Sequence, residues 1–460
     1  MTELELMHDA ERRSRDYLAT VAERRVFPGA EALNDLGQFH EAFPEDGHTD
    51  VSTLALLDDT GSPGTVVSNG PNYFGFVIGA TFPVASAAER LALAWDQCAS
   101  SFDNSPTAAT IEKVASEWML DVLNLPRDSG VSFGTSATAC GLACLVAARR
   151  SLLANKGWDF DSKGLAGAPN VRVVVSELAH ITVIKALRVL GFGTDNLISA
   201  AVDNSGRIDP QQLPDIDDLT ILCLQAGEVN TGAFDPFVPL IGRAREAGAW
   251  VHVDGAFGLW ARANPKTAYL TEGIDAADSW TCDGHKWLNT PYDGAVAICR
   301  DSDLMAGAMN SDAAYSMSSK NSQKNLGLEF SRRARGIAIW AALRTLGRAG
   351  VAALVERHCV QARRLADGLS ASGFTVLNKV VLNQVLVQLD TDEATRELTK
   401  AAADSGKIWF GSSVWQGRVA FRMSVSSWRT RDEDIDSAIE VLCNLRDQLS
   451  RSAKSAPSNA

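Results

Sequence analysis

The sequence predicts an α/β fold built on a largely parallel sheet, followed by a smaller α+β region. Short apolar segments, such as residues 171–175, 220–224 and 250–253, alternate with amphipathic segments of helical length. Strands that alternate with helices of about 10–15 residues are typical of βαβ units. Polar residues follow directly after several of these segments, and open parallel sheets bind ligands at the carboxyl ends of their strands. The sequence therefore predicts a ligand site along that edge of the sheet.

The individual elements follow from apolar periodicity and from the residues that stop it. A helix is expected first, over residues 4–25, and residues 46–71 are rich in Gly, Ser, Thr, Asp and Pro and are expected to be an irregular connection. In the central part, Pro126 and Gly191 end two of the helices. The central helices are expected at 112–125, 137–153, 181–190 and 236–246, and the strands at 171–175, 220–224, 250–253, 279–282 and 295–299.

The pattern changes beyond residue 335. Helices are expected at 337–346, 351–371, 392–405 and 433–449, and strands at 374–377, 384–389 and 418–425. A chain of 460 residues is too long for one ordinary core. We therefore expect an N-terminal helical segment (1–70), a large domain (71–335), a small C-terminal domain (336–450) and a disordered tail (451–460).

Composition excludes several classes of function. The formal net charge of −13 argues against a nucleic-acid partner, which would need clustered Lys and Arg. The eight cysteines include no C-x-x-C pair and no zinc spacing, so no metal site is expected. The N-terminal residues lack the apolar core of a signal peptide, and no apolar run reaches about 18 residues, so no membrane partner is expected. A reduced, cytoplasmic enzyme is the resulting prediction.

Two residues that follow apolar strands indicate a pyridoxal 5'-phosphate (PLP) site. Asp254 closes the strand 250–253, and Lys286 lies beside His285 after the strand 279–282. A lysine forms a Schiff base with PLP, and a carboxylate keeps the pyridine nitrogen protonated so that the ring accepts electrons. Burial of the lysine favours the neutral amine that imine exchange requires. The alternative for Asp254 is a helix N-cap.

Other residues fit around the same cofactor. The small side chain of Ala256 would let the ring lie close, and His180, after the strand 171–175, could stack on the ring or donate a proton. The alternative for His180 is a structural histidine. Thr135, Ser136 and Ala137 precede a long helix, whose free N–H groups would bind the phosphate unless the hydroxyls serve only as caps. His285, or a residue at the end of the 279–283 strand such as Asp283, could add a further phosphate contact.

Two later residues are candidates for contact with substrate. Arg422 lies in an otherwise apolar strand and should have a carboxylate or phosphate partner, which could equally be a structural salt bridge. Tyr315 lies in a segment of small residues with little periodicity. It could belong to a loop that closes over the site and supplies a proton, or it could be an ordinary exposed tyrosine.

Taken in order, these residues resemble the PLP-dependent group II amino-acid decarboxylases, which include aromatic-amino-acid and glutamate decarboxylases, and the bacterial branch most closely. His180 and Trp118 are part of the resemblance. The matching segments span most of the chain: 70–74 (GPNYF), 105–112 (SPTAATIE), 134–137 (GTSA), 230–235 (NTGAFD), 252–256 (HVDGA), 285–288 (HKWL) and 331–335 (SRRAR).

The resemblance implies a type I PLP-dependent fold, like that of aspartate aminotransferase, with a mainly parallel seven-stranded sheet. It also implies a homodimer in which the N-terminal segment packs on the partner subunit. Lys286 would carry the internal aldimine, Asp254 would pair with the pyridine nitrogen, His180 would stack on the ring, and Tyr315 would protonate the quinonoid. The implied reaction is decarboxylation of an L-amino acid to the amine and CO2 through an external aldimine. A C–C lyase of aldolase type or a decarboxylating aldehyde synthase could use the same residues.

The chain departs from better-known members in ways that bear on its substrate. Glu228 lies in a cofactor-side loop, where it could alter the preference for substrate charge or face solvent, and Gly255 and Gly284 replace residues that carry side chains. Tyr73 and Phe74 would line a pocket and favour an aromatic substrate slightly. A nucleotide-binding oxidoreductase would need a G-x-G-x-x-G after its first strand, and the sequence has none. A non-catalytic scaffold is the remaining alternative.

Overall fold

A computed structural model describes residues 1–310 and 322–455 of the chain. Tyr315 therefore lies outside the described residues. The chain divides into two compact units, which are described separately. The large unit comprises residues 81–360 and 378–384, and the small unit comprises residues 1–80, 361–377 and 385–460.

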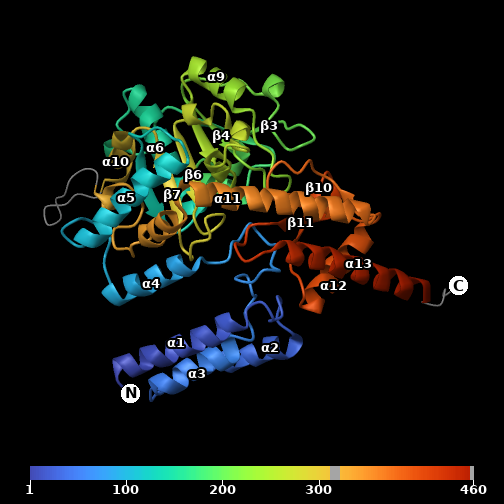
Figure 1. The fold of residues 1–460 in the computed structure, drawn as a ribbon. Helices are drawn as coiled ribbons and strands as arrows, with labels where there is room; N and C mark the ends of the chain where they lie inside the picture. The colour runs from blue at the N-terminus through green and yellow to red at the C-terminus, as the bar shows by residue number, and fades with distance from the viewer. Residues whose placement is uncertain (311–321, 456–460) are drawn as a thin grey trace. The chain divides into compact units, whose positions relative to one another are not determined.

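The large unit is built on a seven-stranded sheet in the order β1-β7-β6-β5-β4-β2-β3, of which β3, β4, β6 and β7 are labelled in Figure 1. The pairs β2–β3, β2–β4, β4–β5 and β5–β6 are parallel, and β7 is antiparallel to both of its neighbours. This arrangement confirms the predicted α/β fold with a mainly parallel sheet. The strands are β1 (Gly130–Gly134), β2 (Arg172–Ser176), β3 (Leu197–Ala200), β4 (Thr220–Gln225), β5 (Trp250–Asp254), β6 (Ser279–Asp283) and β7 (Ala295–Cys299).

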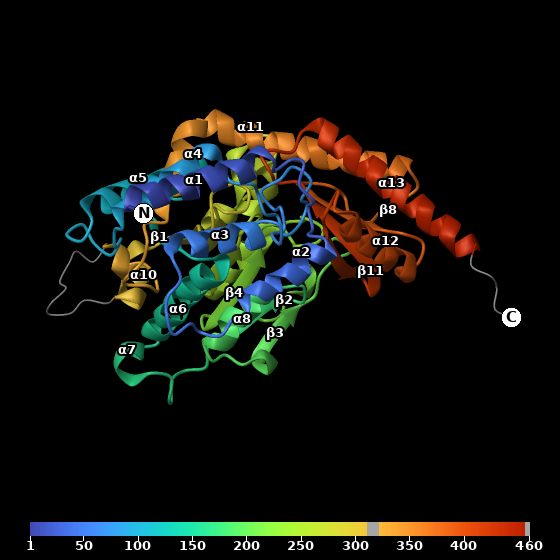
Figure 2. The ribbon, with the colours of Figure 1, turned by 90° about the horizontal axis from the view of Figure 1, so that it is seen from below.

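Helices cover this sheet, and α6 (Ala137–Asn155) and α8 (Ile181–Val189) lie side by side in the view of Figure 2. A core of Leu, Val, Ala and Cys side chains joins these two helices to the strands. The remaining helices that begin in this unit are α4 (Pro83–Trp95), α5 (Pro106–Val122), α7 (Phe160–Lys163), α9 (Phe237–Ala247), α10 (Ser302–Met309) and α11 (Gly336–Ala371). Short 3-10 helices occupy 194–196, 210–212, 258–263, 268–271, 274–276 and 323–325.

Two helices of the described chain, α6 and α11, are long and apolar enough to cross a membrane by length and composition alone. Neither helix is an uninterrupted run of about 18 apolar residues, because arginines interrupt both, and the expected absence of a membrane partner stays a prediction. In α6, 61% of the relevant window is buried within the protein, and its residues pack on β5, β6 and β7. Core helices of globular proteins meet the same criterion, because a helix covered on most sides is apolar all round.

The small unit combines residues from both ends of the chain. The N–H of Val26 donates to Gly406 O (2.7 Å), and the N–H of Phe74 donates to Trp409 O (2.8 Å). Its four strands, in the order β10-β11-β9-β8, are β8 (Thr375–Val376), β9 (Gln384–Gln388), β10 (Gly411–Trp415) and β11 (Arg418–Ser424). Its helices are α1 (Glu3–Ala19), α2 (Ala30–Asp35), a 3-10 turn (Leu36–Phe39), α3 (Asp50–Gly61), α12 (Asp392–Ser405) and α13 (Asp432–Ser455).

Several elements differ from those expected. Residues 46–71 were expected to be irregular but contain α3, which begins where Thr49 accepts a hydrogen bond from the N–H of Ser52 (3.2 Å). Arg13 of α1 also pairs with Asp58 of α3 (2.9 Å), a tertiary contact that composition does not reveal. Helix α13 extends to Ser455, past residue 450, where the ordered chain was expected to end. The elements α4, β1, β3 and β10 were not expected.

A buried ion pair joins α5 to the segment that leads into α11. Arg332 donates two hydrogen bonds to Glu112, at 2.8 and 2.7 Å, and both side chains are 2% exposed. The N–H of Gly336 also donates to Glu112 (3.2 Å). The bidentate geometry and the third donor satisfy a carboxylate that would otherwise be costly to bury.

We predict that Glu112→Gln lowers the free energy of unfolding by about 3 kcal/mol, because it leaves the buried Arg332 guanidinium without a counter-charge. Urea unfolding followed by tryptophan fluorescence measures the loss. Glu117→Gln, at an exposed position of the same helix, is the matched control. Equal stability of the two variants would contradict a stabilising role for this ion pair.

Candidate active site

Asp254 closes β5 at the carboxyl edge of the parallel sheet. It lies in register with Gln225 of β4 and Thr281 of β6. Its Oδ1 accepts hydrogen bonds from the N–H of Ala256 (3.1 Å) and from Thr281 Oγ1 (3.4 Å). Among the described residues none donates to Oδ2 of Asp254. One carboxylate oxygen is therefore held in place while the other remains available to a donor.

Lys286 lies in the tight turn that follows β6. Backbone hydrogen bonds close this turn, from Thr290 N to Gly284 O (3.1 Å) and from Gly284 N to Gly294 O (2.8 Å). The Lys286 Nζ lies 3.2 Å from Asp283 Oδ2, and the two side chains are 21% and 2% exposed. The other oxygen, Asp283 Oδ1, is buried and accepts no hydrogen bond within the described part of the chain. Lysine and aspartate thus face each other at the end of a buried strand, and Lys286 remains reachable.

His285 is enclosed by the same turn. Its Nδ1 lies 3.0 Å from Gly294 O, its Nε2 lies 3.7 Å from Asp283 Oδ2, and its ring centroid lies 4.5 Å from that of Tyr292. Burial lowers the pKa of His285 and outweighs the opposite effect of Asp283. Burial likewise raises the pKa of Tyr292 to about 12. Both rings are therefore uncharged at neutral pH.

His180 is the N-cap residue of α8 and follows the carboxyl end of β2. Its Nδ1 accepts a hydrogen bond from the N–H of Thr182 (3.3 Å) and lies 2.7 Å from Thr182 Oγ1. This histidine thus has a structural role, the alternative considered for it, and the structure shows that role to be a helix cap. The cap also holds the imidazole ring at the edge of the sheet where Asp254 and Asp283 end.

Thr135, Ser136 and Ala137 form the connection from β1 to α6. Ser136 caps α6 by accepting from the N–H of Ala139 (3.4 Å). The N–H groups of Ala137 and Thr138 donate to no described residue, as expected for the first turn of a helix. This 19-residue helix lies on the face of the sheet to which Asp254 and Thr281 point, since a Cβ added at Gly141 would lie 3.8 Å from Thr281 Cγ2.

The three residues expected to contact substrate lie in the small unit. Arg422 is on β11, opposite Gly411 of β10, and is 8% exposed. The ring of Tyr73 stacks on Trp409 with centroids 5.0 Å apart, and Phe74 is 1% exposed in the core. Packing within the small unit therefore accounts for both aromatic residues without a ligand.

Sequence reasoning missed Thr281 and Gln225, which flank Asp254 on the neighbouring strands. Thr281 Oγ1 contacts the Asp254 carboxylate, and the Nε2 of Gln225 is buried with no hydrogen-bond acceptor among the described residues. Aligning the three strand ends in a parallel sheet would have found both residues, because paired residues point to the same face.

The structure explains the three positions at which the chain differs from better-known members of the family: Glu228, Gly255 and Gly284. Glu228 is 1% exposed and accepts hydrogen bonds from the N–H groups of Asn230 (2.8 Å) and Thr231 (2.7 Å), so it does not face solvent. A Cβ at Gly255 would lie 2.7 Å from the Cβ of Leu259. A Cβ at Gly284 would lie 3.0 Å from Thr290 Oγ1 and 3.2 Å from Ile339 Cγ1. Close packing therefore explains both glycines.

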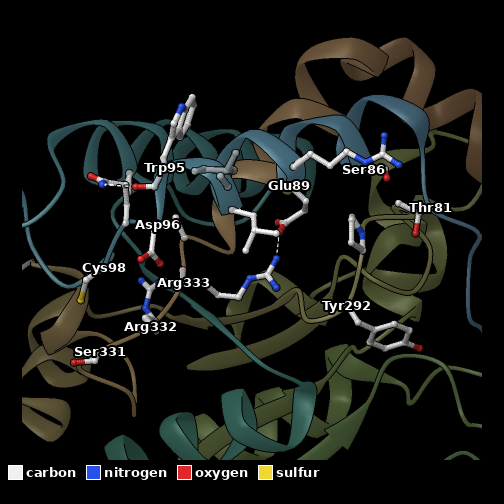
Figure 3. A pocket seen from close by; sticks show the side chains of 18 residues that line it. Thr81, Ser86, Glu89, Trp95, Asp96, Cys98, Tyr292, Ser331, Arg332 and Arg333 are labelled. Atoms are coloured by element: carbon white, nitrogen blue, oxygen red, sulfur yellow. Dashed lines mark hydrogen bonds and ion pairs between the residues drawn. The ribbon is translucent and has the colours of Figure 1, made fainter. Parts of the chain in front are cut away.

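A cavity of about 810 Å³ adjoins the turn that carries Lys286 (Figure 3). Tyr292 lines this cavity and packs on His285, which connects it to that turn. An ion pair between Glu89 and Arg333 lies across its wall, and Trp95 contributes an aromatic ring. The candidate active site thus has a cavity next to its polar residues.

The donor set fits PLP. Oδ2 of Asp254 is available to a pyridine N–H, and the buried Oδ1 of Asp283 lacks a donor within the described chain. Lys286 supplies an accessible amine, and the first turn of α6 supplies N–H groups of the kind that bind phosphate.

Comparison with known proteins agrees with this fit. A family profile described as "Pyridoxal-dependent decarboxylase conserved domain" matches residues 37–390. Tryptophan decarboxylase 1 of Oryza sativa subsp. japonica is 27% identical over 433 residues, covering 85% of this chain and 83% of its own. Phenylacetaldehyde synthase of Arabidopsis thaliana is 24% identical over 93% and 92%. In fold, the chain resembles the Oryza sativa TDC solved with PLP and tryptamine, with TM-score 0.88, 24% identity and 97% of each chain covered.

The chain belongs to the pyridoxal-dependent decarboxylase family. It is accordingly a PLP-dependent carboxy-lyase with the type I fold expected from its motifs. The relatives named above are plant enzymes, so the expected likeness to the bacterial branch is not supported.

We predict that His252 makes the stability of the protein fall in acid. His252 is 1% exposed on β5, its Nδ1 lies 2.9 Å from Ser279 Oγ, and burial lowers its pKa from 6.5 to about 4. Between these values the unfolded chain binds a proton that the folded protein does not. The free energy of unfolding should therefore fall by about 3 kcal/mol as pH drops through this window.

Urea unfolding of the wild type and of His252→Asn across that pH range tests the assignment. The variant should lose most of this pH dependence. His8→Asn, at an exposed position of α1, controls for the loss of a histidine. Identical pH profiles for the wild type and the His252 variant would rule out this contribution.

Proposed function

We propose that the chain decarboxylates an aromatic L-amino acid to the corresponding amine and CO2. The observation that carries the proposal is the contact between Lys286 Nζ and Asp283 Oδ2 at the end of β6, beside Asp254 at the end of β5. The aromatic preference is supported by relatives named as tryptophan decarboxylase (27% identical) and as Tyrosine/DOPA decarboxylase 5 of Papaver somniferum (24% identical).

PLP, when bound, supplies an electron-accepting ring for the electrons released as the bond from Cα to the carboxylate breaks. Lys286 would hold the cofactor through its amine. Asp254 would accept a hydrogen bond from the pyridine nitrogen at Oδ2, while Thr281 and the N–H of Ala256 keep the carboxylate oriented through Oδ1. A carboxylate fixed in this way keeps the pyridine nitrogen protonated.

The other proposed contacts lie around this pair. His180 would flank the ring, because its cap on α8 fixes the imidazole at the end of β2. Thr135, Ser136 and Ala137 would bind the phosphate at the positive end of α6. His285 and Asp283 would hold the turn that presents Lys286, and the small Ala256 side chain leaves room for the ring.

Three further residues would contact the substrate. Arg422 would attract the substrate carboxylate, and Tyr73 and Phe74 would shape an aromatic pocket, although packing explains both rings. Tyr315 would return a proton to Cα, as the family resemblance implies.

A homodimer and a cytoplasmic location complete the proposal. Exposed apolar side chains of α4, Leu91 (57%), Leu93 (80%) and Trp95 (42%), support a partner surface. All eight cysteines are free, and six of them are buried in the large unit, which supports a reducing compartment.

A decarboxylating aldehyde synthase is the second candidate function. Two relatives support it: the Arabidopsis phenylacetaldehyde synthase and the 4-hydroxyphenylacetaldehyde synthase of Rhodiola rosea, which is 25% identical over 448 residues. The same cofactor residues serve both reactions, so product identity decides between them. No comparable observation favours a C–C lyase.

We predict that a panel of L-amino acids will give CO2 and amine in equal amounts with an aromatic substrate. Phenylalanine, tyrosine and tryptophan should react faster than glutamate, leucine and lysine. Coupled CO2 detection with chromatography of amines and aldehydes measures this. Aldehyde in place of amine would favour the second candidate, and preference for glutamate would overturn the aromatic assignment.

We predict that Lys286→Ala abolishes both turnover and the visible absorbance of lysine-bound cofactor, because no other described residue supplies an amine to Asp283. Lys185→Ala, at an exposed position of α8, is the control and should retain both. Absorption spectra and single-turnover CO2 assays test the pair. Normal absorbance in the Lys286 variant would refute its role.

A further inference from the structure

A second cavity, of about 410 Å³, lies at the opposite edge of the large-unit sheet from Lys286. It opens at the amino ends of β2 and β3, whereas Asp254 and Asp283 end their strands at the carboxyl edge. The walls come from the last turns of α6, the connection 165–171, and the segment after α8. Its volume is in the range of small-molecule sites.

Arg149 of α6 lines this cavity and is 7% exposed. Its Nη1 donates to Leu190 O at the end of α8 (2.6 Å), and its guanidinium carbon lies 4.9 Å from the Phe160 ring centroid and 5.6 Å from that of Phe192. Its Nε is buried and donates to no described residue. No carboxylate of the described chain lies within ion-pair distance of it.

A buried guanidinium without a counter-ion is unfavourable by several kcal/mol. The stacked rings and one carbonyl oxygen offset only part of that cost. Burial also lowers the pKa of Arg149, as expected for a cation without an anionic partner. An anion bound beside Arg149 would therefore stabilise the buried guanidinium.

The other charged groups at the cavity do not meet this requirement. Arg172 also lines it, but Arg172 Nη2 donates to Asp215 O (3.0 Å) and pairs with Asp217 Oδ2 (3.3 Å). Arg172 is therefore neutralised by Asp217, and Arg149 supplies the uncompensated charge. Apart from these arginines and two asparagines the lining is apolar or glycine, including Leu153, Leu165, Pro169 and Phe192.

We propose that this cavity is a second ligand site, for a small organic monocarboxylate with an apolar or aromatic body. The carboxylate pairs with the Arg149 guanidinium, and the body lies against the leucine and phenylalanine side chains. A guanidinium matches carboxylate geometry, and the apolar walls exclude heavily hydrated anions. The site is independent of the proposed substrate assignment, because it lies at the other edge of the sheet.

Isothermal titration of the holoenzyme with 3-phenylpropanoate tests the proposal. The neutral analogue 3-phenylpropanamide should bind at least roughly tenfold more weakly, as expected for loss of a charge-assisted pair. Inorganic phosphate should bind weakly or not at all. Equal affinity for the acid and the amide, or tighter binding of phosphate, would overturn the proposal.

Substitutions of residues that line the cavity test whether 3-phenylpropanoate binds there. Arg149→Met and Ala168→Phe should each weaken 3-phenylpropanoate binding by at least roughly tenfold, the first by removing the charge and the second by filling the cavity with Arg149 in place. Arg150→Met is the matched control, because Arg150 pairs with Asp161 (2.6 Å) and does not line the cavity.

The Ala168 variant keeps the test decisive if Arg149→Met fails to fold. Binding that persists in a folded Ala168→Phe protein would show that the ligand lies elsewhere, for instance beside Lys286, and would overturn the proposal. Because the measurement is of binding and not of turnover, failure of the decarboxylase assignment would leave it unaffected.

Discussion

The parallel pairing of β5 with β6 is the constraint on which the site depends. The register that sets Asp254 opposite Thr281 makes both side chains point to one face of the sheet, and Asp283 follows on the same face. A slip of one residue would turn Asp254 away from Lys286. Helix α6 covers this face, so the same pairing also determines where its N-terminal N–H groups lie.

Buried charge is compensated differently in different parts of the large unit. Glu112 has a bidentate arginine, and Glu228 is satisfied by the N–H groups of its own turn. Asp283 has a lysine on one oxygen and no described donor on the other, and Arg149 has no described anion. The fully paired groups, Glu112 and Glu228, stabilise the fold. The incompletely paired Asp283 and Arg149 lie beside the proposed cofactor site and ligand site.

The elements of the fold that could be predicted were those whose apolar residues recur with a strong period. The strands that carry Asp254 and Asp283 and the helix after Ser136 were expected within a few residues of their positions. Strand β1 (GVSFG) and helix α3 were not, because Gly and Ser weaken the apolar pattern of β1, and α3 is held in part by a tertiary contact, Arg13–Asp58. Thr281 was missed for a similar reason: its contact with Asp254 exists only across two paired strands.

The sequence by itself determined the strongly periodic strands and helices, the chemical groups at the strand ends, and hence the cofactor and the family. These depend on residue type and local spacing, which the chain carries without folding. Only the tertiary structure decided that Glu228 is buried, that Gly255 and Gly284 are required by packing, and that no described carboxylate pairs with Arg149. Such properties depend on distances between segments far apart in the chain, and no local pattern encodes them.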